Sequence, residues 1–292
     1  MSEHDPFPDA RTLLDKYGLR AKKQFGQNFL ISERVFRAIV DATVVNEDDW
    51  IVEIGPGVGT LTARLAARVP EGKIIAVERD PDMVALLRGE MGHVDNVQIE
   101  PADAMRYDLV MAARWRGDKI AVCGNLPYHI ASQLLFRVCD ARAHVSRCVV
   151  MVQKEMADRI CAPPGGKDYG ALGVMLTTYF DVRAVAKAPA GAFVPAPKVD
   201  STVIRLIPLA NAEPRVPIGD PAHYSKVVHA AFGQRRKTLR NALRAVFTDD
   251  DVDEALRITG IDGGRRGETL SIAEFAAMAL ALPVGPGQAQ LD

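Results

Sequence analysis

The 292-residue chain has few cysteines, almost no net charge and no long apolar run. Its 4 cysteines form no C-x-x-C pair, which disfavours a disulfide scaffold and fits a reducing compartment. A formal net charge of −1 excludes a generally basic nucleic-acid-binding protein. No apolar stretch reaches the ~18 residues of a membrane span, and the first residues lack the features of a secretory signal. We therefore expect a cytoplasmic protein that does not enter a membrane.

The cysteines also fail to indicate a metal or catalytic site. Cys139, His144 and Cys148 lack a fourth ligand at regular spacing, and the two cysteines lie in apolar stretches. Cys123 has no evident activating base in its motif, so the pattern does not favour a nucleophile. We expect these residues to pack in the interior, and we expect no metal site.

What the chain does have is a globular composition, with 48% apolar and 25% charged residues, and a length typical of about two domains. Strand-like runs alternate with helical stretches, which predicts a doubly wound α/β sheet. These runs lie near residues 50–54, 74–77, 97–100, 119–124 and 147–153. Residues 172–180 and 202–207 are predicted to form a final pair of strands.

The domain limits follow from this pattern. Residues 1–20 are predicted to be a flexible tail and residues 21–209 to form the α/β domain. After a linker, apolar residues recur at helical spacing, so residues 210–282 are predicted to form a small all-helical domain. Residues 283–292 are expected to be disordered.

A glycine turn follows the first strand-like run, where residues 53–59 are Glu-Ile-Gly-Pro-Gly-Val-Gly. Strand, glycine turn and helix form the layout of a nucleotide-binding unit, although a strained loop gives the same pattern. The G-x-G-x-G spacing disfavours a pyrophosphate ligand. Glu78 lies 23 residues after Gly55, near the ~20-residue offset of an acid that binds ribose hydroxyls. Asp103, at the next strand end, is a candidate partner for an adenine amino group. Either acid can also be a helix N-cap or a loop charge.

The segment Gly124-Asn125-Leu126-Pro127-Tyr128 follows another apolar run. Asn125 offers a side-chain acceptor, the carbonyl of Leu126 is a second acceptor, and Pro127 stiffens the backbone and lacks an N–H. Tyr128 supplies a stacking face. Two acceptors on the hydrogens of an adenine N6 favour tetrahedral geometry and direct its lone pair at an electrophile. The motif therefore indicates chemistry on an adenine amine, while a simple strand end and turn is the alternative.

Positive charge gathers near the C-terminus. The segment 225–248 contains no Asp or Glu, and Arg236, Arg240 and Arg244 recur at helical spacing. Such a helix can lie along RNA phosphates, or it can be a solvated basic face. The candidate RNA-binding residues along the whole chain are Lys22, Lys23, Lys198, Arg235, Arg236, Lys237 and Arg240.

Taken together, these motifs resemble the small-subunit ribosomal RNA adenine N6,N6-dimethyltransferases, which use S-adenosylmethionine. The resemblance runs from about Lys22 to about Ala281. Besides the glycine turn, Glu78, Asp103 and the Asn125 motif, it is carried by residues 25–30 (Phe-Gly-Gln-Asn-Phe-Leu), 153–155, 193–201 and 232–239. It implies a Rossmann-like methyltransferase sheet with a small helical C-terminal domain.

The resemblance also implies roles for individual residues. The donor S-adenosyl-L-methionine would be bound by Gln27, Asn28, Leu30, Gly55, Gly57, Glu78, Asp103 and Asn125. Tyr128 and Phe193 would stack on the target adenine, although Phe193 can also be a core or hinge aromatic. Leu126 and Pro127 would complete the catalytic motif. The implied reaction is dimethylation of two adjacent adenosines in a hairpin loop near the 3′ end of small-subunit (16S) rRNA. The implied partner is the immature 30S particle, and we expect a monomer.

Three other functions remain open on the sequence. A large-subunit rRNA adenine methyltransferase shares the α/β domain. A non-catalytic RNA-binding assembly factor keeps the fold, although intact Glu78, Asp103, Asn125 and Tyr128 disfavour loss of chemistry. A nicotinamide dehydrogenase needs an acid/base for hydride transfer, and none is evident.

Overall fold

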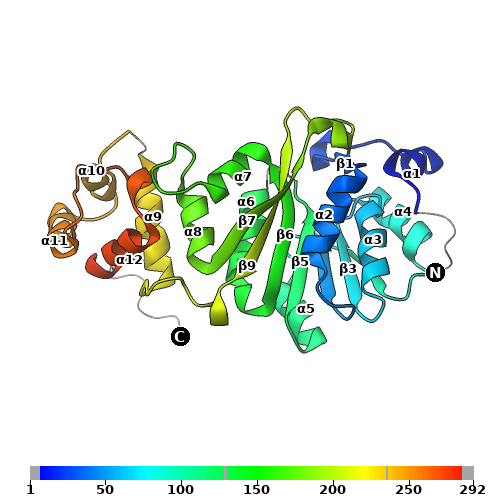
Figure 1. Ribbon diagram of the computed structural model, residues 1–292, viewed down its shortest axis with the longest axis horizontal. Coiled ribbons are helices and arrows are strands. Elements are labelled where there is room, and N and C mark those ends of the chain that lie inside the picture. Colours follow the sequence, from blue (N-terminus) through cyan, green and yellow to red (C-terminus); the bar gives the residue numbers. More distant parts are fainter. Residues whose placement is uncertain (1–6, 128–129, 235, 285–292) are drawn as a thin grey trace. The chain divides into compact units, whose positions relative to one another are not determined.

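The computed structural model describes residues 7–127, 130–234 and 236–284. The chain divides into two compact units, whose helices and strands are labelled in Figure 1. The first unit comprises Met1–Ala157 and Asp181–Asn211, and the second comprises Asp158–Phe180 and Ala212–Asp292.

The first unit contains a seven-stranded sheet in the order β4-β3-β2-β5-β6-β9-β7. Its centre is parallel, because β2 pairs with β3 and β5, β3 with β4, and β5 with β6. Strand β9 runs antiparallel to β6. The bounds are Trp50–Ile54 (β2), Lys73–Glu78 (β3), Val97–Pro101 (β4), Ile120–Asn125 (β5), Val145–Gln153 (β6), Phe180–Ala188 (β7) and Ser201–Pro208 (β9). The predicted Rossmann-like fold is confirmed, and the carboxyl ends of its parallel strands meet at one edge.

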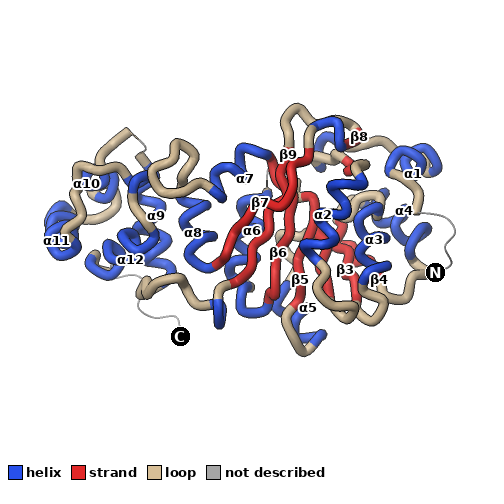
Figure 2. Tube along the Cα trace, viewed as in Figure 1, coloured by secondary structure: helices blue, strands red, loops and turns tan. Residues whose placement is uncertain are grey.

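Helices cover both faces of this sheet (Figure 2). Side chains alternate along each strand, so Ile51, Ile74, Ala121 and Val149 share one face and join a hydrophobic cluster with residues of α2 and α3. The helices of this unit are α1 (Ala10–Lys16), α2 (Glu33–Thr43), α3 (Thr60–Arg68), α4 (Pro81–Met91), α5 (Leu109–Arg116) and α6 (Ala131–Asp140). Helix α7 (Lys154–Cys161) crosses the division between the units.

Helix α1 corrects the prediction of a flexible tail for residues 7–20, while residues 1–6 of that predicted tail lie outside the described residues. Asp9 caps the helix by accepting a 2.9 Å hydrogen bond from the Thr12 N–H. Leu13 and Leu14 are buried in a cluster that also contains Val58, next to the glycine turn. The sequence did not indicate this helix because the segment has no long apolar run. Burial of the two adjacent leucines against the rest of the unit stabilises the short helix.

Helix α8 (Ala171–Tyr179) corrects the predicted strand at residues 172–180. The run is almost entirely apolar, and such a run fits a buried helix as well as a buried strand. The Thr178 hydroxyl donates a 2.8 Å hydrogen bond to the Val174 carbonyl of the same helix. It also lies 2.9 Å from the Tyr224 hydroxyl, which connects α8 to a later helix. Residues 158–180 therefore cluster with the C-terminal helices rather than with the predicted 21–209 domain.

The second unit is helical. Besides α8 it contains α9 (Pro221–Gly233), α10 (Leu239–Leu243), α11 (Asp249–Thr259) and α12 (Ile272–Ala281). Tyr169 and Phe275 are buried in its core, and the partly buried ring of Phe232 has its centroid 5.9 Å from that of Tyr169 and 5.7 Å from that of Phe275. Among the residues that the structure describes, no helix has the length and apolarity needed to cross a membrane.

Candidate active site

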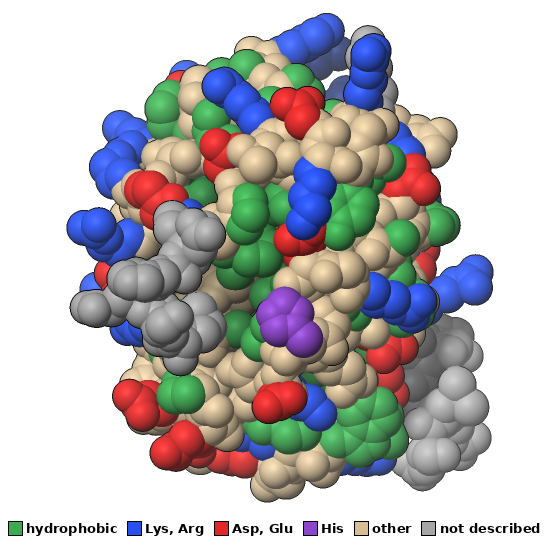
Figure 3. Space-filling model, turned by 90° about the vertical axis from the view of Figure 1, so that its right-hand side faces the viewer, with side chains coloured by type: hydrophobic (Ala, Val, Ile, Leu, Met, Phe, Trp, Pro, Cys, Tyr) green, Lys and Arg blue, Asp and Glu red, His purple; other side chains and the backbone are tan. Residues whose placement is uncertain are grey.

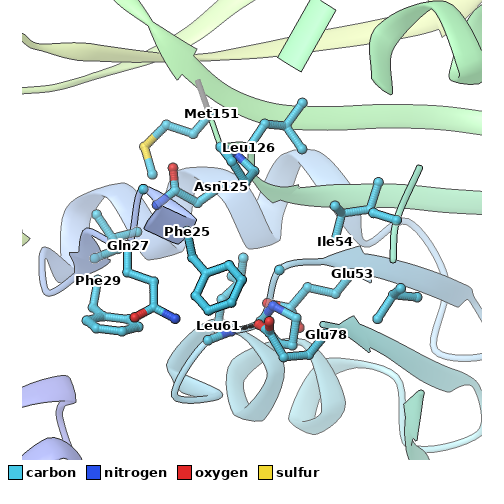
Figure 4. Close-up of a pocket in the computed structure, with 18 of the residues that line it drawn as sticks. Phe25, Gln27, Phe29, Glu53, Ile54, Leu61, Glu78, Asn125, Leu126 and Met151 are labelled. Atoms are coloured by element: carbon cyan, nitrogen blue, oxygen red, sulfur yellow. Dashed lines mark hydrogen bonds between the residues drawn. The ribbon is translucent and has the colours of Figure 1, made fainter. Parts of the chain in front are cut away.

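A pocket lies at the carboxyl ends of β2, β3, β4 and β5, where a parallel sheet binds its ligands (Figure 4). Residues 25–30 form one wall of it. The predicted donor-binding and catalytic residues that line this one pocket are Gln27, Asn28, Leu30, Gly55, Gly57, Glu78, Asp103, Asn125, Leu126 and Pro127. The structure therefore brings together residues that are up to 100 positions apart in the chain.

The glycine turn needs its glycines for two reasons. Gly55, Gly57 and Gly59 have φ of +67°, +58° and +84°, a region that other residues adopt at a cost. In addition, a Cβ on Gly57 would lie 2.9 Å from Cε1 of Phe29, which is too close. The turn therefore leaves a cradle of backbone that a ligand can approach closely.

Glu78 ends β3 and holds this turn in place. Its Oε2 accepts a 3.1 Å hydrogen bond from the Gly57 N–H, and its Oε1 accepts 2.8 Å bonds from the N–H groups of Arg79 and Asp80. Burial raises the pKa of Glu78, and the three backbone donors oppose that shift only in part. The carboxylate is thus fixed in the pocket wall. This position is compatible with the predicted contact to ribose hydroxyls.

Glu53 is a pocket residue that the sequence reasoning did not assign. It is 1% exposed, and burial raises its pKa to about 7, helped by the nearby charge of Glu78. Its Oε2 has no hydrogen-bond partner among the described residues. An acid within an apolar strand, directly before a glycine turn, was the signal that could have identified it. The unsatisfied oxygen marks this wall as a place for a polar ligand.

Asn125 lies at the end of β5 and faces the segment 25–30. Its Nδ2 donates a 3.0 Å hydrogen bond to the Asn28 carbonyl, which leaves the side-chain oxygen as an acceptor. The neighbouring Leu126 N–H donates to the Met151 carbonyl at 3.1 Å. The two residues that supply the predicted acceptors are therefore each held in place by a hydrogen bond to a backbone carbonyl. Tyr128, the predicted stacking residue, lies outside the described residues.

Phe193 does not line the pocket. It is 3% exposed and belongs to the hydrophobic cluster with Leu30 and Phe36. Its strand β8 (Phe193–Val194) pairs with β1 (Phe29–Leu30), which carries the pocket wall. The structure thus favours the alternative of a core aromatic, because a ring packed on all sides presents no free face, and the stacking role of Phe193 stays a prediction.

Asp103 lies in the pocket wall at the end of β4. Its Oδ1 accepts a 2.9 Å hydrogen bond from the Met105 N–H, and its Oδ2 lies 3.7 Å from Nη1 of Arg79. Its side chain is 36% exposed, so one carboxylate edge is open to a ligand. Arg79, Phe25 and Met151 also line the pocket, and the sequence analysis gave none of them a role. Phe25 and Arg79 are close in the chain to predicted site residues, whereas only the tertiary fold brings Met151 there.

The predicted RNA-binding lysines of the first unit differ from one another. Lys22 is engaged, since its Nζ lies 2.6 Å from both Asp80 Oδ1 and Asp82 Oδ2. Its predicted contact with RNA stays a prediction. Lys198 is exposed. The side chain of Lys23 lies outside the described residues, and basic and acidic side chains are mixed on the face drawn in Figure 3.

The basic segment of the second unit is shorter as a helix than predicted. Helix α10 begins at Leu239, so Arg236 and Lys237 lie in the preceding turn, where both are exposed. Arg240 does lie on the helix, but its Nε is 3.6 Å from a carboxylate oxygen of Asp253. The predicted cationic stripe is corrected accordingly, because Thr238 caps the helix and stops it from extending backwards. Arg235 lies outside the described residues.

Residues 18–282 match the family described as Ribosomal RNA adenine dimethylase. The chain is 46% identical over 286 residues to Ribosomal RNA small subunit methyltransferase A of Anaeromyxobacter sp. (strain K), covering 94% of this chain and 98% of that protein. The protein of the same name from Myxococcus xanthus (strain DK1622) is 44% identical over 280 residues, covering 94% and 96%.

Solved structures show the same fold. A dimethyladenosine transferase from Plasmodium falciparum matches with a TM-score of 0.70 at 22% identity, covering 86% of this chain and 96% of that one. The 23S rRNA methyltransferase ErmE matches with a TM-score of 0.65 at 25% identity, covering 87% and 99%. The chain belongs to the ribosomal RNA adenine dimethylase family and is an S-adenosylmethionine-dependent methyltransferase with a Rossmann-like fold.

Proposed function

We propose that the chain dimethylates N6 of two adjacent adenosines in a hairpin loop near the 3′ end of small-subunit rRNA. The observation that supports this most is the single pocket in which Asn125 and Leu126 meet the glycine turn, Glu78 and Asp103. Relatives that are 44% and 46% identical are small-subunit methyltransferases. We further propose that it acts as a monomer in the cytoplasm, on the immature small-subunit particle.

The residues of the pocket fit the donor. Glu78 can accept from ribose hydroxyls and Asp103 from the adenine amino group, while the glycine cradle admits a ligand close to the backbone. When bound, S-adenosylmethionine supplies an electrophilic methyl group on a sulfonium. Glu53 adds a buried acid with a free oxygen to the same wall.

The residues of the chain contribute to catalysis by aligning the target amine with the methyl group of the donor. The Asn125 side-chain oxygen and the Leu126 carbonyl accept from the two hydrogens of the target amine and hold its nitrogen in line with the methyl group. Both oxygens also favour the positive charge that develops on that nitrogen. Because the methylated ammonium is acidic, its proton can leave without a dedicated base.

Label transfer to ribosomal particles tests this function. The full-length protein, tritiated S-adenosylmethionine and small-subunit particles that lack the modification should yield labelled N6,N6-dimethyladenosine on nucleoside analysis. Large-subunit particles from the same cells serve as the matched control. The proposal fails if the digest contains no dimethyladenosine.

The second candidate is methylation of large-subunit rRNA. The likeness to ErmE, at a TM-score of 0.65, is the observation that favours it. Label in the large-subunit RNA instead of the small-subunit RNA would establish this alternative.

A further inference from the structure

The segment 22–30 is fastened across the pocket by one buried carboxylate. Asp80 is 0% exposed. Its Oδ1 accepts a 2.6 Å hydrogen bond from Lys22 Nζ, and its Oδ2 accepts a 2.8 Å bond from Gln27 Nε2. The other end of the Gln27 carboxamide is also hydrogen-bonded, because its Oε1 accepts a 2.9 Å bond from the Lys22 backbone N–H. Burial favours the neutral acid, but these donors lower the pKa of Asp80 below its usual value, so it is an anion at neutral pH.

The same carboxylate belongs to a chain of contacts that reaches the donor-binding residues. The Asp80 N–H donates to Glu78 Oε1 at 2.8 Å, and Glu78 Oε2 accepts from Gly57. The far end of the segment is held separately, by the hydrogen bond from Asn125 to the Asn28 carbonyl. The wall over the pocket is thus tied at both ends to groups of the proposed site.

Between these two ties the segment carries Phe25 into the pocket. Figure 4 shows its ring in the cavity, between Gln27 and the acids Glu53 and Glu78. The guanidinium of Arg79 lies 5.1 Å from the ring centroid and also pairs with Asp103. Phe25 is therefore at the end of the pocket where Asp103 is expected to meet adenine, and an aromatic ring suits a planar base.

We propose that Asp80 is a positioning residue of the donor site, which locks the segment 22–30 in place and presents Phe25 to the adenosyl part of the donor. This inference rests on the proposed function, because it takes the pocket to be the donor site. A cofactor-independent consequence also follows. Loosening Asp80 must expose the peptide bond after Lys22 to protease, with or without donor.

The competing role for Asp80 is purely structural. It is the N-cap of α4, where its Oδ1 accepts the Asp82 N–H at 3.1 Å. Asparagine caps helices about as well as aspartate, so Asp80→Asn keeps the cap. It does not keep the lock, because the new amide would set its own N–H group against Nε2 of Gln27. Turning Gln27 over would in turn cost its bond from the Lys22 N–H.

The experiment compares three variants with the wild type, using trypsin digestion, calorimetric Kd for S-adenosylmethionine and S-adenosylhomocysteine, and steady-state kinetics. For Asp80→Asn we expect faster cleavage after Lys22 and a Kd and donor KM raised by about tenfold to hundredfold, with little change in kcat. Asp82→Asn is the matched control. Its carboxylate touches the same lysine but is 48% exposed and outside the pocket, so we expect near-wild-type values.

Gln27→Glu combined with Asp80→Asn should restore protease resistance, which is its readout because Gln27 itself lines the pocket. The exchanged pair can accept the Lys22 N–H and the new amide N–H, and it returns the negative charge beside Lys22. Unchanged Kd and cleavage in Asp80→Asn would overturn the inference, as would fast cleavage after Lys22 that the double variant does not slow. A wild type that binds neither compound would instead refute the proposed function, while the cleavage rates would still decide whether Asp80 locks the segment.

Discussion

Two glutamates, one in each unit, have pKa values that are shifted in opposite directions. Glu53 lies in the pocket wall of the α/β unit with one unsatisfied oxygen, and burial raises its pKa to about 7. Glu274 lies in the helical unit, where the Arg265 guanidinium and the α12 cap lower its pKa to about 2. At neutral pH, Glu53 therefore destabilises the folded state, whereas Glu274 stabilises it. The unsatisfied acid thus lies in the wall of the proposed donor pocket, whereas the satisfied one lies in a helix cap.

The largest effect is expected from a substitution in the proposed catalytic motif of the pocket. Asn125→Ala removes an acceptor aimed at the target amine, so we expect methyl transfer to fall by about 10²- to 10³-fold. The fold should persist, because the substitution removes one partly buried amide. Single-turnover transfer to small-subunit particles measures the effect. Asn46→Ala, at an exposed position, is the control and should retain wild-type rates. Normal transfer by Asn125→Ala would show that the motif is not catalytic.

The next effect tests the helical unit through Arg265. Arg265→Gln removes the ion pair with Glu274 and should lower the free energy of unfolding by about 1–2 kcal/mol at neutral pH. Because the folded-state pKa of Glu274 is depressed, its contribution is present above about 4.5 and is lost as the pH falls toward about 2. Denaturant unfolding at several pH values measures this effect. The free energy of unfolding should depend less on pH in the acid range for the variant than for the wild type.

The adjacent arginine supplies the control for that measurement. Arg266 is 55% exposed, and its nearest carboxylate oxygen, in Glu268, is 3.9 Å away. Arg266→Gln should therefore change stability little. Equal losses in the two variants would mean that the Arg265 pair has no special role in the fold.

The two regions also differ in how well the sequence predicts them. The pocket was predictable because the ends of parallel strands meet at one edge, so Glu78, Asp103 and Asn125 had to converge once the strands were recognised. The roles of the basic residues were less predictable, because the effect of a charge depends on its partners. Arg240 meets Asp253 and Lys22 meets Asp80, and no local pattern marks either pairing. The sequence left Phe193 open between a stacking ring and a core aromatic for a related reason, since burial is a property of the whole core.

A smaller effect concerns Glu53. A folded-state pKa raised from 4.5 to about 7 means that the protonated acid suits the fold, and that stability is lost as the pH rises through about 7. Glu53→Gln should abolish this loss, so the variant gains on the wild type between about pH 5 and about pH 8. Unfolding free energies across that range measure it. Glu71→Gln, at an exposed position, should follow the wild type, and a Glu53 variant that also does so would contradict the assigned pKa.

The smallest effect separates two arginines of the second unit. Arg236 is exposed and forms no ion pair with another described residue, whereas Arg240 lies 3.6 Å from Asp253. If the turn before α10 meets RNA phosphates, Arg236→Gln should flatten the plot of log affinity against log salt by about one contact, while Arg240→Gln should change it less. Filter binding of small-subunit rRNA over a salt series gives both slopes. Donor affinity should stay unchanged in both variants. Equal slopes would mean that Asp253 does not weaken Arg240, and a fall in donor affinity would mean that the turn serves the fold rather than the RNA.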